Sequence, residues 1–255
     1  MLPREVLLPA SELPCNLNRT LPLQISHYIP FESEAGFFQL YAQDKYSSAR
    51  FMRDLGKRFE GADISFKPYP SCRGTHAIVE AALELQKQNG FRARDIAGMK
   101  ALGSPYFAFL NQTVEPGTAM DAKFSSRYSV ASALLDGELT LRSFTPEALR
   151  RPEALELGKL LAYEADESVP LQESSNGGME ITLRDGRVLR REMKKPPGHP
   201  DNPISFEQLV EKFRDCASYS CKPIPDQRLD DFIGDVLALE KLDDAGRLMA
   251  HFSAP

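Results

Sequence analysis

The strongest constraint on the fold is a hairpin pattern between residues 179 and 193. Met179–Leu183 alternates apolar and polar residues, and Asp185-Gly186 has the composition of a tight turn leading into Val188–Met193. Strands joined by so short a turn pair antiparallel. The sequence therefore predicts a sheet that contains at least one antiparallel pair.

Helical patterns lie on both sides of this hairpin. Apolar residues recur at helical spacing in residues 31–59, and Thr75 has the composition of an N-cap for a helix that ends at Asn89-Gly90. Single helices are also expected over Asp121–Leu135, after Thr145-Pro146, after Pro152, from the capping box that begins at Ser205, and near Leu229–Leu242.

Two further short strands are expected, at Asp63–Tyr69 and Asp95–Leu102. Helices and strands are segregated along the chain, which favours an α+β fold over a doubly wound parallel sheet. Prolines at positions 3, 9, 14, 22 and 30 remove backbone donors at short intervals. Residues 1–30 are therefore expected to form an irregular arm.

Charge and composition exclude several classes of protein. The 255 residues carry 31 Lys and Arg against 36 Asp and Glu, a net charge of −5, and the mean hydropathy is −0.35. We therefore expect no nucleic-acid partner, no membrane-spanning helix and no signal peptide. Four cysteines without a dense framework favour a reducing, cytoplasmic setting. Because Cys216 and Cys221 lack a second thiol pair, no structural zinc site is expected.

The stretch from Phe66 to His76 concentrates reactive and charged residues. Lys67 ends an extended segment, and Ser71, Cys72, Arg73, Thr75 and His76 lead into a predicted helix. Backbone N–H groups at a helix N-terminus favour a carboxylate or phosphate. The alternative interpretation is structural, with Thr75 as a cap, Cys72 as a small buried residue and His76 bonded to a backbone carbonyl.

Three motifs in this order resemble the MmgE/PrpD family, which includes 2-methylcitrate dehydratases, cis-aconitate decarboxylases and an epimerase. The motifs are Lys67-Pro-Tyr-Pro-Ser-Cys-Arg-Gly-Thr-His76, then Asp121-Ala-Lys-Phe-Ser125 with Tyr128, then Pro197-Gly-His-Pro-Asp-Asn-Pro203 before Lys212-Phe213. Glu34-Ala-Gly-Phe-Phe38 matches the motif expected upstream, although Ser33 stands where the family has glycine.

The resemblance implies an α+β lid domain with antiparallel strands at residues 61–195. An all-helical domain would be formed by residues 31–60 and 196–255, which flank the lid. Family members act on carboxylate-rich substrates between the two domains, without a metal or organic cofactor. A small carboxylate such as 2-methylcitrate is therefore the expected substrate.

The resemblance also assigns residues to the site. Lys67, Cys72, His76 and Tyr128 would be catalytic, with Lys67 binding a carboxylate or moving a proton. Substrate-binding residues would be Arg73, Lys123 and Ser125, and no residue would hold a metal.

Family members are longer than this chain, and most of their helical domain precedes the segment that matches. The chain resembles the C-terminal half of a member, so weak or absent activity is expected of it alone. The expected assembly is a homodimer or a pair with a separately encoded N-terminal half. Two other interpretations stay open: a non-catalytic subunit of such a pair, and a small-anion binding protein.

Overall fold

The computed structural model describes residues 31, 36–43, 45–59, 61 and 64–252. The chain divides into two compact units, residues 1–62 and 63–255, which are described separately. The predicted irregular arm of residues 1–30 lies outside the described residues.

In the described part of the first unit, residues 36–59 form two short helices rather than the continuous helix expected over residues 31–59. A π-helical turn spans Phe38–Ala42, and α2 spans Ser48–Met52. Phe38 is buried because its ring stacks on Tyr46, with ring centroids 4.0 Å apart, and meets Phe51 edge-on. This small unit is therefore held together mainly by aromatic contacts.

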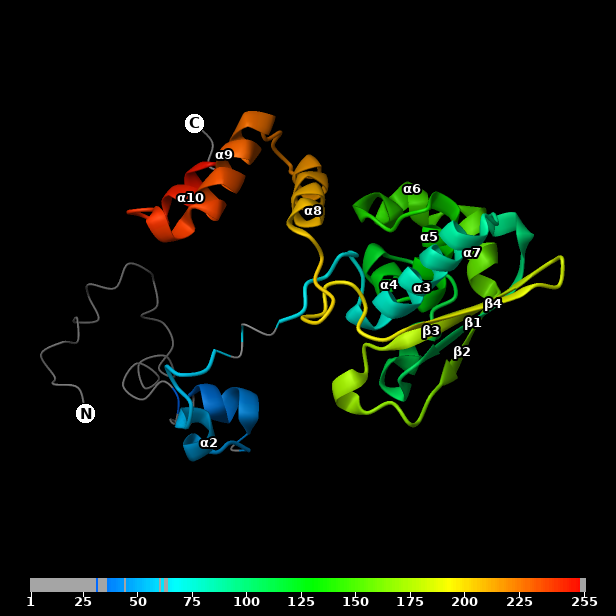
Figure 1. Cartoon of the computed structure of the whole chain (residues 1–255), viewed down its shortest axis with the longest axis horizontal. Coiled ribbons are helices and arrows are strands. Elements are labelled where there is room, and N and C mark those ends of the chain that lie inside the picture. Colours follow the sequence, from blue (N-terminus) through cyan, green and yellow to red (C-terminus); the bar gives the residue numbers. More distant parts are fainter. Residues whose placement is uncertain (1–30, 32–35, 44, 60, 62–63, 253–255) are drawn as a thin grey trace, which may run out of the picture. The chain divides into compact units, whose positions relative to one another are not determined.

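The second unit is built on a four-stranded mixed sheet in the order β2-β1-β3-β4 (Figure 1). The strands are β1 (Ile96–Gly103), β2 (Leu161–Ala165), β3 (Gly177–Leu183) and β4 (Val188–Met193). The predicted hairpin is β3-β4, with Gly186 at φ +90° in its turn. The α+β class is confirmed, but β1 and β2 pair parallel, a pairing that the sequence analysis did not include.

Helices cover one face of the sheet. These are α3 (Arg73–Asn89), α4 (Ala119–Lys123), α5 (Ser126–Asp136), α6 (Pro146–Leu149) and α7 (Pro152–Lys159). α3 packs on β3 and β4 and against α5, which in turn packs against α7. α3 ends where expected, because Gly90 adopts φ +66° as the C-cap and its N–H bonds to the Gln86 carbonyl.

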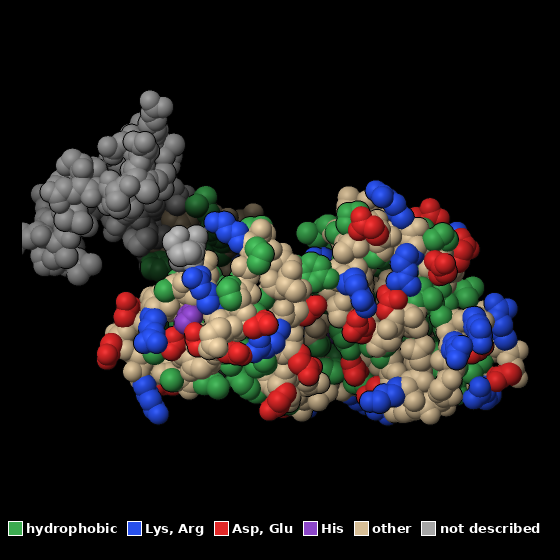
Figure 2. Space-filling view, turned by 90° about the horizontal axis from the view of Figure 1, so that it is seen from above, with side chains coloured by type: hydrophobic (Ala, Val, Ile, Leu, Met, Phe, Trp, Pro, Cys, Tyr) green, Lys and Arg blue, Asp and Glu red, His purple; other side chains and the backbone are tan. Residues whose placement is uncertain are grey.

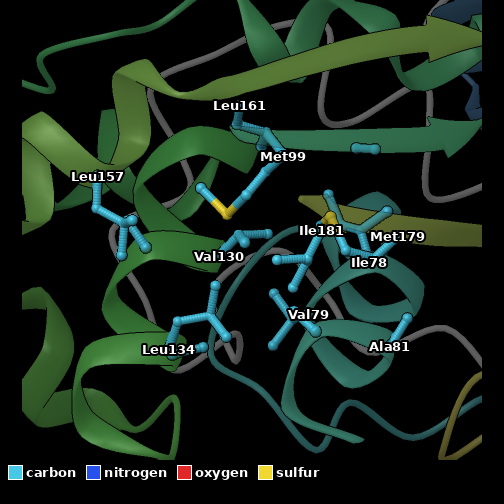
Figure 3. Packing of buried hydrophobic residues seen from close by; sticks show 14 of the residues in the cluster. Ile78, Val79, Ala81, Met99, Val130, Leu134, Leu157, Leu161, Met179 and Ile181 are labelled. Carbon is cyan, nitrogen blue, oxygen red and sulfur yellow. The ribbon is translucent and has the colours of Figure 1, made fainter. Parts of the chain in front are cut away.

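The core lies between these helices and the sheet. Figure 3 shows Ile78 and Val79 of α3 facing Ile181 of β3, with Val130 of α5 and Met99 of β1 beside them. All five are at most 4% exposed. The core therefore fixes α3 rigidly on the sheet, and the N-terminus of α3 carries the densest motif of the sequence.

Three amphipathic helices follow the sheet: α8 (Phe206–Ser218), α9 (Asp226–Leu237) and α10 (Arg247–Ala250). The Ser205 capping box at the start of α8 is confirmed. The rings of Phe213, Phe232 and Phe252 pack together. Leu237 nevertheless remains 63% exposed and Met249 66% exposed, so these helices present uncovered apolar surface.

Three local predictions are wrong. Residues 64–67 form no strand, since Pro68 and Pro70 interrupt the ladder of backbone donors. The helix expected over Asp121–Leu135 is two helices, because the Ser125 side chain accepts the Tyr128 N–H and starts α5 anew. Thr75 is not the N-cap of α3, which begins two residues earlier at Arg73, after Cys72.

Candidate functional site

The first two motifs meet at the N-terminus of α3. The Cys72 N–H donates to the carbonyl of Lys123 at 2.8 Å, which ties the start of α3 to the end of α4. Gly74 makes close packing possible here, since a Cβ at this position would collide with the Phe107 ring and lie 2.8 Å from Leu110 Cδ1. The first turn of α3 is therefore fixed on two sides.

The third motif reaches the same place from more than 120 residues further along the chain. The Phe66 N–H donates to the carbonyl of Gly198 at 2.8 Å. Gly198 adopts φ +84°, and a Cβ there would collide with the Phe66 carbonyl. The segment of residues 195–202, here called the strap, therefore lies directly against the backbone that precedes Lys67.

Arg73 connects these segments. Its Nη1 donates to the carbonyls of Pro197 at 2.9 Å and Phe66 at 3.4 Å, and its Nη2 donates to Pro196 at 3.3 Å. The side chain is half-buried, and burial lowers the pKa of Arg73. Its guanidinium donates to backbone carbonyls, and its predicted role in substrate binding stays a prediction.

His76 lies beneath Arg73 and is fully buried. Arg73 Nη1 lies 3.2 Å from Nδ1 of the imidazole, and Nε2 lies 3.4 Å from the Ser71 carbonyl. Because a guanidinium can only donate, Nδ1 is the acceptor and Nε2 carries the proton. Burial, together with the positive charges of Arg73, Lys67 and Lys212, lowers the pKa of His76 to about 3 despite its bond to Ser71. The imidazole is therefore neutral near pH 7.

Lys67, Arg73 and Lys212 form a group of positive charges, called here the cation cluster. All three lie near enough to His76 to disfavour its protonated form. The Lys67 side chain is exposed, and its backbone carbonyl accepts a hydrogen bond from the Lys212 ammonium group of α8. An exposed lysine shortly before a helix N-terminus, with two further cations near the same buried histidine, is suited to binding a carboxylate-rich anion.

Hydroxyl groups close the first turn of α3. The Thr75 hydroxyl donates to the Cys72 carbonyl at 2.9 Å, so the Ser71 hydroxyl donates to Thr75 Oγ1 at 2.7 Å. Ser71 and Thr75 are buried, whereas Cys72 is partly exposed. Among these three residues, the Cys72 thiol is the group with access to solvent, and its predicted catalytic role stays a prediction.

The second motif brings its backbone to the site, whereas its side chains are engaged elsewhere. The Ser125 hydroxyl is buried and donates to the Thr113 carbonyl at 2.8 Å. The Lys123 ammonium group lies 5.7 Å from the centroid of the Phe144 ring. Tyr128 is 1% exposed and its hydroxyl donates to the Ser143 carbonyl at 2.7 Å, and burial raises the pKa of Tyr128. These contacts are structural, and the predicted chemical roles of the three residues stay predictions.

Replacing Tyr128 by phenylalanine tests the structural role of the Tyr128 hydroxyl. The change leaves the buried Ser143 carbonyl without its donor, so we expect a loss of about 1–2 kcal/mol in the free energy of unfolding. Urea unfolding of the purified variant measures this loss. An unchanged free energy of unfolding would contradict the structural role of the Tyr128 hydroxyl.

Sequence reasoning did not assign a role to Lys212, Tyr69 or Glu80. The Tyr69 hydroxyl donates to the Glu80 carboxylate, and burial together with the negative charge of Glu80 raises the pKa of Tyr69. Both residues line an open groove of about 760 Å³ that also includes Pro197 and Lys212. Lys212 follows the third motif, but the sequence contains no sign that its side chain reaches Lys67.

Surface charge is mixed on one face of the molecule. On the face seen in Figure 2, Lys and Arg side chains alternate with Asp and Glu, and hydrophobic side chains lie between them. Across the described residues, no group of three or more His, Cys, Asp or Glu side chains is arranged to hold a metal ion. None of the helices in the part of the chain that the structure describes is long and apolar enough to span a membrane.

The fold and the site define an α+β domain in which three sequence motifs meet at one helix N-terminus. Comparison with known proteins identifies the family. The MmgE/PrpD C-terminal domain model matches residues 69–235. The chain belongs to the MmgE/PrpD family.

Curated relatives agree with this assignment. Cis-aconitate decarboxylase from Homo sapiens is 27% identical over 227 residues, which cover 87% of this chain and 46% of that protein. The enzyme of the same name from Mus musculus is 28% identical over 199 residues, which cover 76% and 40%. A cis-aconitate decarboxylase-like protein from Aspergillus oryzae is 26% identical over 235 residues, which cover 87% and 48%. The chain spans about half the length of the curated relatives it matches.

Proposed function

We propose that this chain carries the carboxylate-binding part of an MmgE/PrpD-type lyase that acts on a small tricarboxylate. The observation that carries the proposal is the meeting of three motifs at the N-terminus of α3, where the cation cluster of Lys67, Arg73 and Lys212 lies. Two relatives are named cis-aconitate decarboxylases, which supports a tricarboxylate as the substrate class.

The cation cluster suits the charge changes of such a reaction. Loss of a carboxyl group as CO2, or removal of the proton α to a carboxylate in a dehydration, places negative charge next to a carboxylate in the transition state. A fixed cation at that carboxylate stabilises the developing charge more than the ground state, and this difference accelerates the reaction. Lys67 is the exposed member of the cluster and is proposed to make that contact.

Decarboxylation of cis-aconitate is proposed ahead of dehydration of 2-methylcitrate, since decarboxylase is the activity in the names of the relatives. His76 is proposed to act as a neutral support of the cluster rather than as a general acid, because Nδ1 accepts from Arg73 and the low pKa keeps the ring uncharged. We further propose residues 61–195 as the lid and residues 31–60 and 196–255 as parts of a helical domain.

The uncovered apolar surface of α8–α10 supports a second candidate, a subunit that pairs with a helical partner. Leu237 and Met249 are exposed on helices that bury little else. Apolar surface of this kind marks protein–protein contacts in soluble proteins. A partner is required for activity in this candidate, whereas the lyase proposal attributes weak turnover to the chain alone.

Replacing Lys67 by methionine tests the lyase proposal. The purified chain, at high concentration with cis-aconitate or 2-methylcitrate, is expected to give slow turnover that proton NMR detects in the vinylic region. We expect the turnover rate of the Lys67→Met variant to be lower by a factor of about ten or more, because a cation at the reacting carboxylate is removed.

The matched control is Lys222→Met, which removes an equally exposed ammonium group after α8. Its rate should equal that of the unmodified chain. Equal rates for Lys67→Met and the control would contradict the role of Lys67. Citrate binding without turnover of either substrate would favour the small-anion binding protein, and turnover that needs an added protein would favour the subunit.

A further inference from the structure

Arg73 uses its guanidinium group to hold backbone rather than to face solvent. Its Nη1 is shared among three acceptors: the carbonyls of Phe66 and Pro197, and Nδ1 of His76. Its Nη2 donates to the carbonyl of Pro196. Because Nη1 has two N–H groups and three acceptors already, a carboxylate on Nη1 would have to displace one of these bonds.

The carbonyls that Arg73 contacts lie on either side of the crossing between the strap and the segment that carries Lys67. Phe66 immediately precedes Lys67, while Pro196 and Pro197 belong to the strap. The Phe66 N–H completes the crossing through its bond to Gly198. On the other side, the Lys212 ammonium group binds the carbonyl of Lys67 itself. The backbone is therefore held by a cation at both peptide carbonyls that flank Lys67.

We propose that Arg73 is a positioning residue, which fixes the backbone of Lys67 against the strap and acts on a bound carboxylate through Lys67 rather than by contact. This inference rests on the proposed function, since it presumes that Lys67 is the carboxylate ligand. His76 completes the arrangement, because its neutral Nδ1 accepts from the guanidinium on the buried side.

The geometry distinguishes positioning from direct binding. A lysine in place of Arg73 keeps the positive charge, but its three donors diverge from one nitrogen and do not reproduce the planar fork that reaches the carbonyls of Phe66, Pro196 and Pro197. If Arg73 binds the carboxylate directly, both variants lose citrate affinity, because lysine does not replace a bidentate guanidinium, but the Phe66 amide keeps its protection. If Arg73 positions Lys67, the planar fork is what matters, and Arg73→Lys behaves like the uncharged Arg73→Gln.

The experiment measures two quantities on the same set of proteins. Citrate serves as the tricarboxylate probe, and isothermal titration gives its dissociation constant for the unmodified chain, Arg73→Lys, Arg73→Gln and the control Arg150→Lys, whose side chain is exposed. Hydrogen exchange of the Phe66 amide reports the crossing with Gly198 independently of any ligand, and exchange of the Val79 amide in α3 reports the fold.

We expect both Arg73 variants to weaken citrate binding by about tenfold to a hundredfold, the loss typical of a misplaced binding group. In both, the Phe66 amide should exchange faster while Val79 keeps its protection, and Arg150→Lys should match the unmodified chain. Citrate affinity in Arg73→Lys within about twofold of the unmodified chain would overturn the inference, as would unchanged Phe66 exchange in both variants. If the unmodified chain binds no citrate, the proposed function fails, and the exchange of Phe66 alone decides whether Arg73 fixes the Lys67 segment.

Discussion

Replacing Gly198 by alanine is expected to lower the free energy of unfolding by about 3 kcal/mol or more. Two causes act together. The φ of +84° disfavours any side chain, and the added Cβ would collide with the Phe66 carbonyl, which belongs to rigid backbone. Relief of the collision requires the strap to move away from Phe66, so citrate affinity should fall as well. Urea unfolding and citrate titration measure the two effects.

Gly186→Ala is the matched control for this change. Gly186 adopts φ +90° in the β3-β4 turn, and a Cβ there meets no atom within 4 Å. Alanine at this position carries the cost of the backbone conformation alone, about 1 kcal/mol. If the two variants lose equal stability, the close approach of the strap to Phe66 is not what Gly198 permits.

Acidification is expected to destabilise the protein through His76. The pKa of His76 is about 3 in the folded chain and near 6.5 in an unfolded one, so the unfolded chain binds the proton first as the pH falls. The contribution of His76 is therefore fully present above pH 6.5 and is lost progressively toward pH 3. Holding the imidazole neutral over this range corresponds to about 5 kcal/mol.

Comparison with His76→Gln isolates this contribution. Glutamine can accept from Arg73 and donate to the Ser71 carbonyl, but it does not titrate. Between pH 6.5 and 4, the free energy of unfolding of the unmodified chain should fall more steeply than that of the variant, by about 1.4 kcal/mol for each pH unit. Parallel pH profiles would show that His76 is not held neutral in the folded chain.

The elements that could be predicted from sequence are those marked by turn and capping residues close together in the chain. The β3-β4 hairpin follows from Asp185-Gly186, the end of α3 from Gly90, and the start of α8 from the Ser205 capping box. Each of these features depends on residues within one turn of each other, so their chemistry is visible in the sequence.

The rest of the fold could not be predicted, because it depends on pairing between segments that are far apart in the sequence. β2 is five residues long and three of these residues are exposed, so no apolar alternation marked it. Its parallel partner β1 lies about sixty residues earlier. The break between α4 and α5 depends on Ser125, a residue that also fits inside a helix. In such cases, tertiary contacts decide between conformations that the local sequence permits equally well.

The candidate site could likewise be predicted only in part. Its location at the start of α3 could be predicted, because Lys67, Cys72 and Arg73 are neighbours in the chain. The partners of Arg73 could not, since the Pro196 and Pro197 carbonyls lie more than 120 residues away and backbone acceptors leave no sequence signal. The buried hydroxyl bond of Tyr128 was hidden for the same reason.

In the proposed function, a tricarboxylate binds at the N-terminus of α3 through Lys67. Citrate titration followed by amide chemical shifts in two-dimensional NMR tests it most directly, with Lys67→Met and Lys222→Met measured alongside. We predict shifts concentrated at Lys67 and at residues 72–75, saturating with one citrate per chain, and lost in Lys67→Met alone. Citrate shifts at another surface, or shifts that persist unchanged in Lys67→Met, would contradict the account.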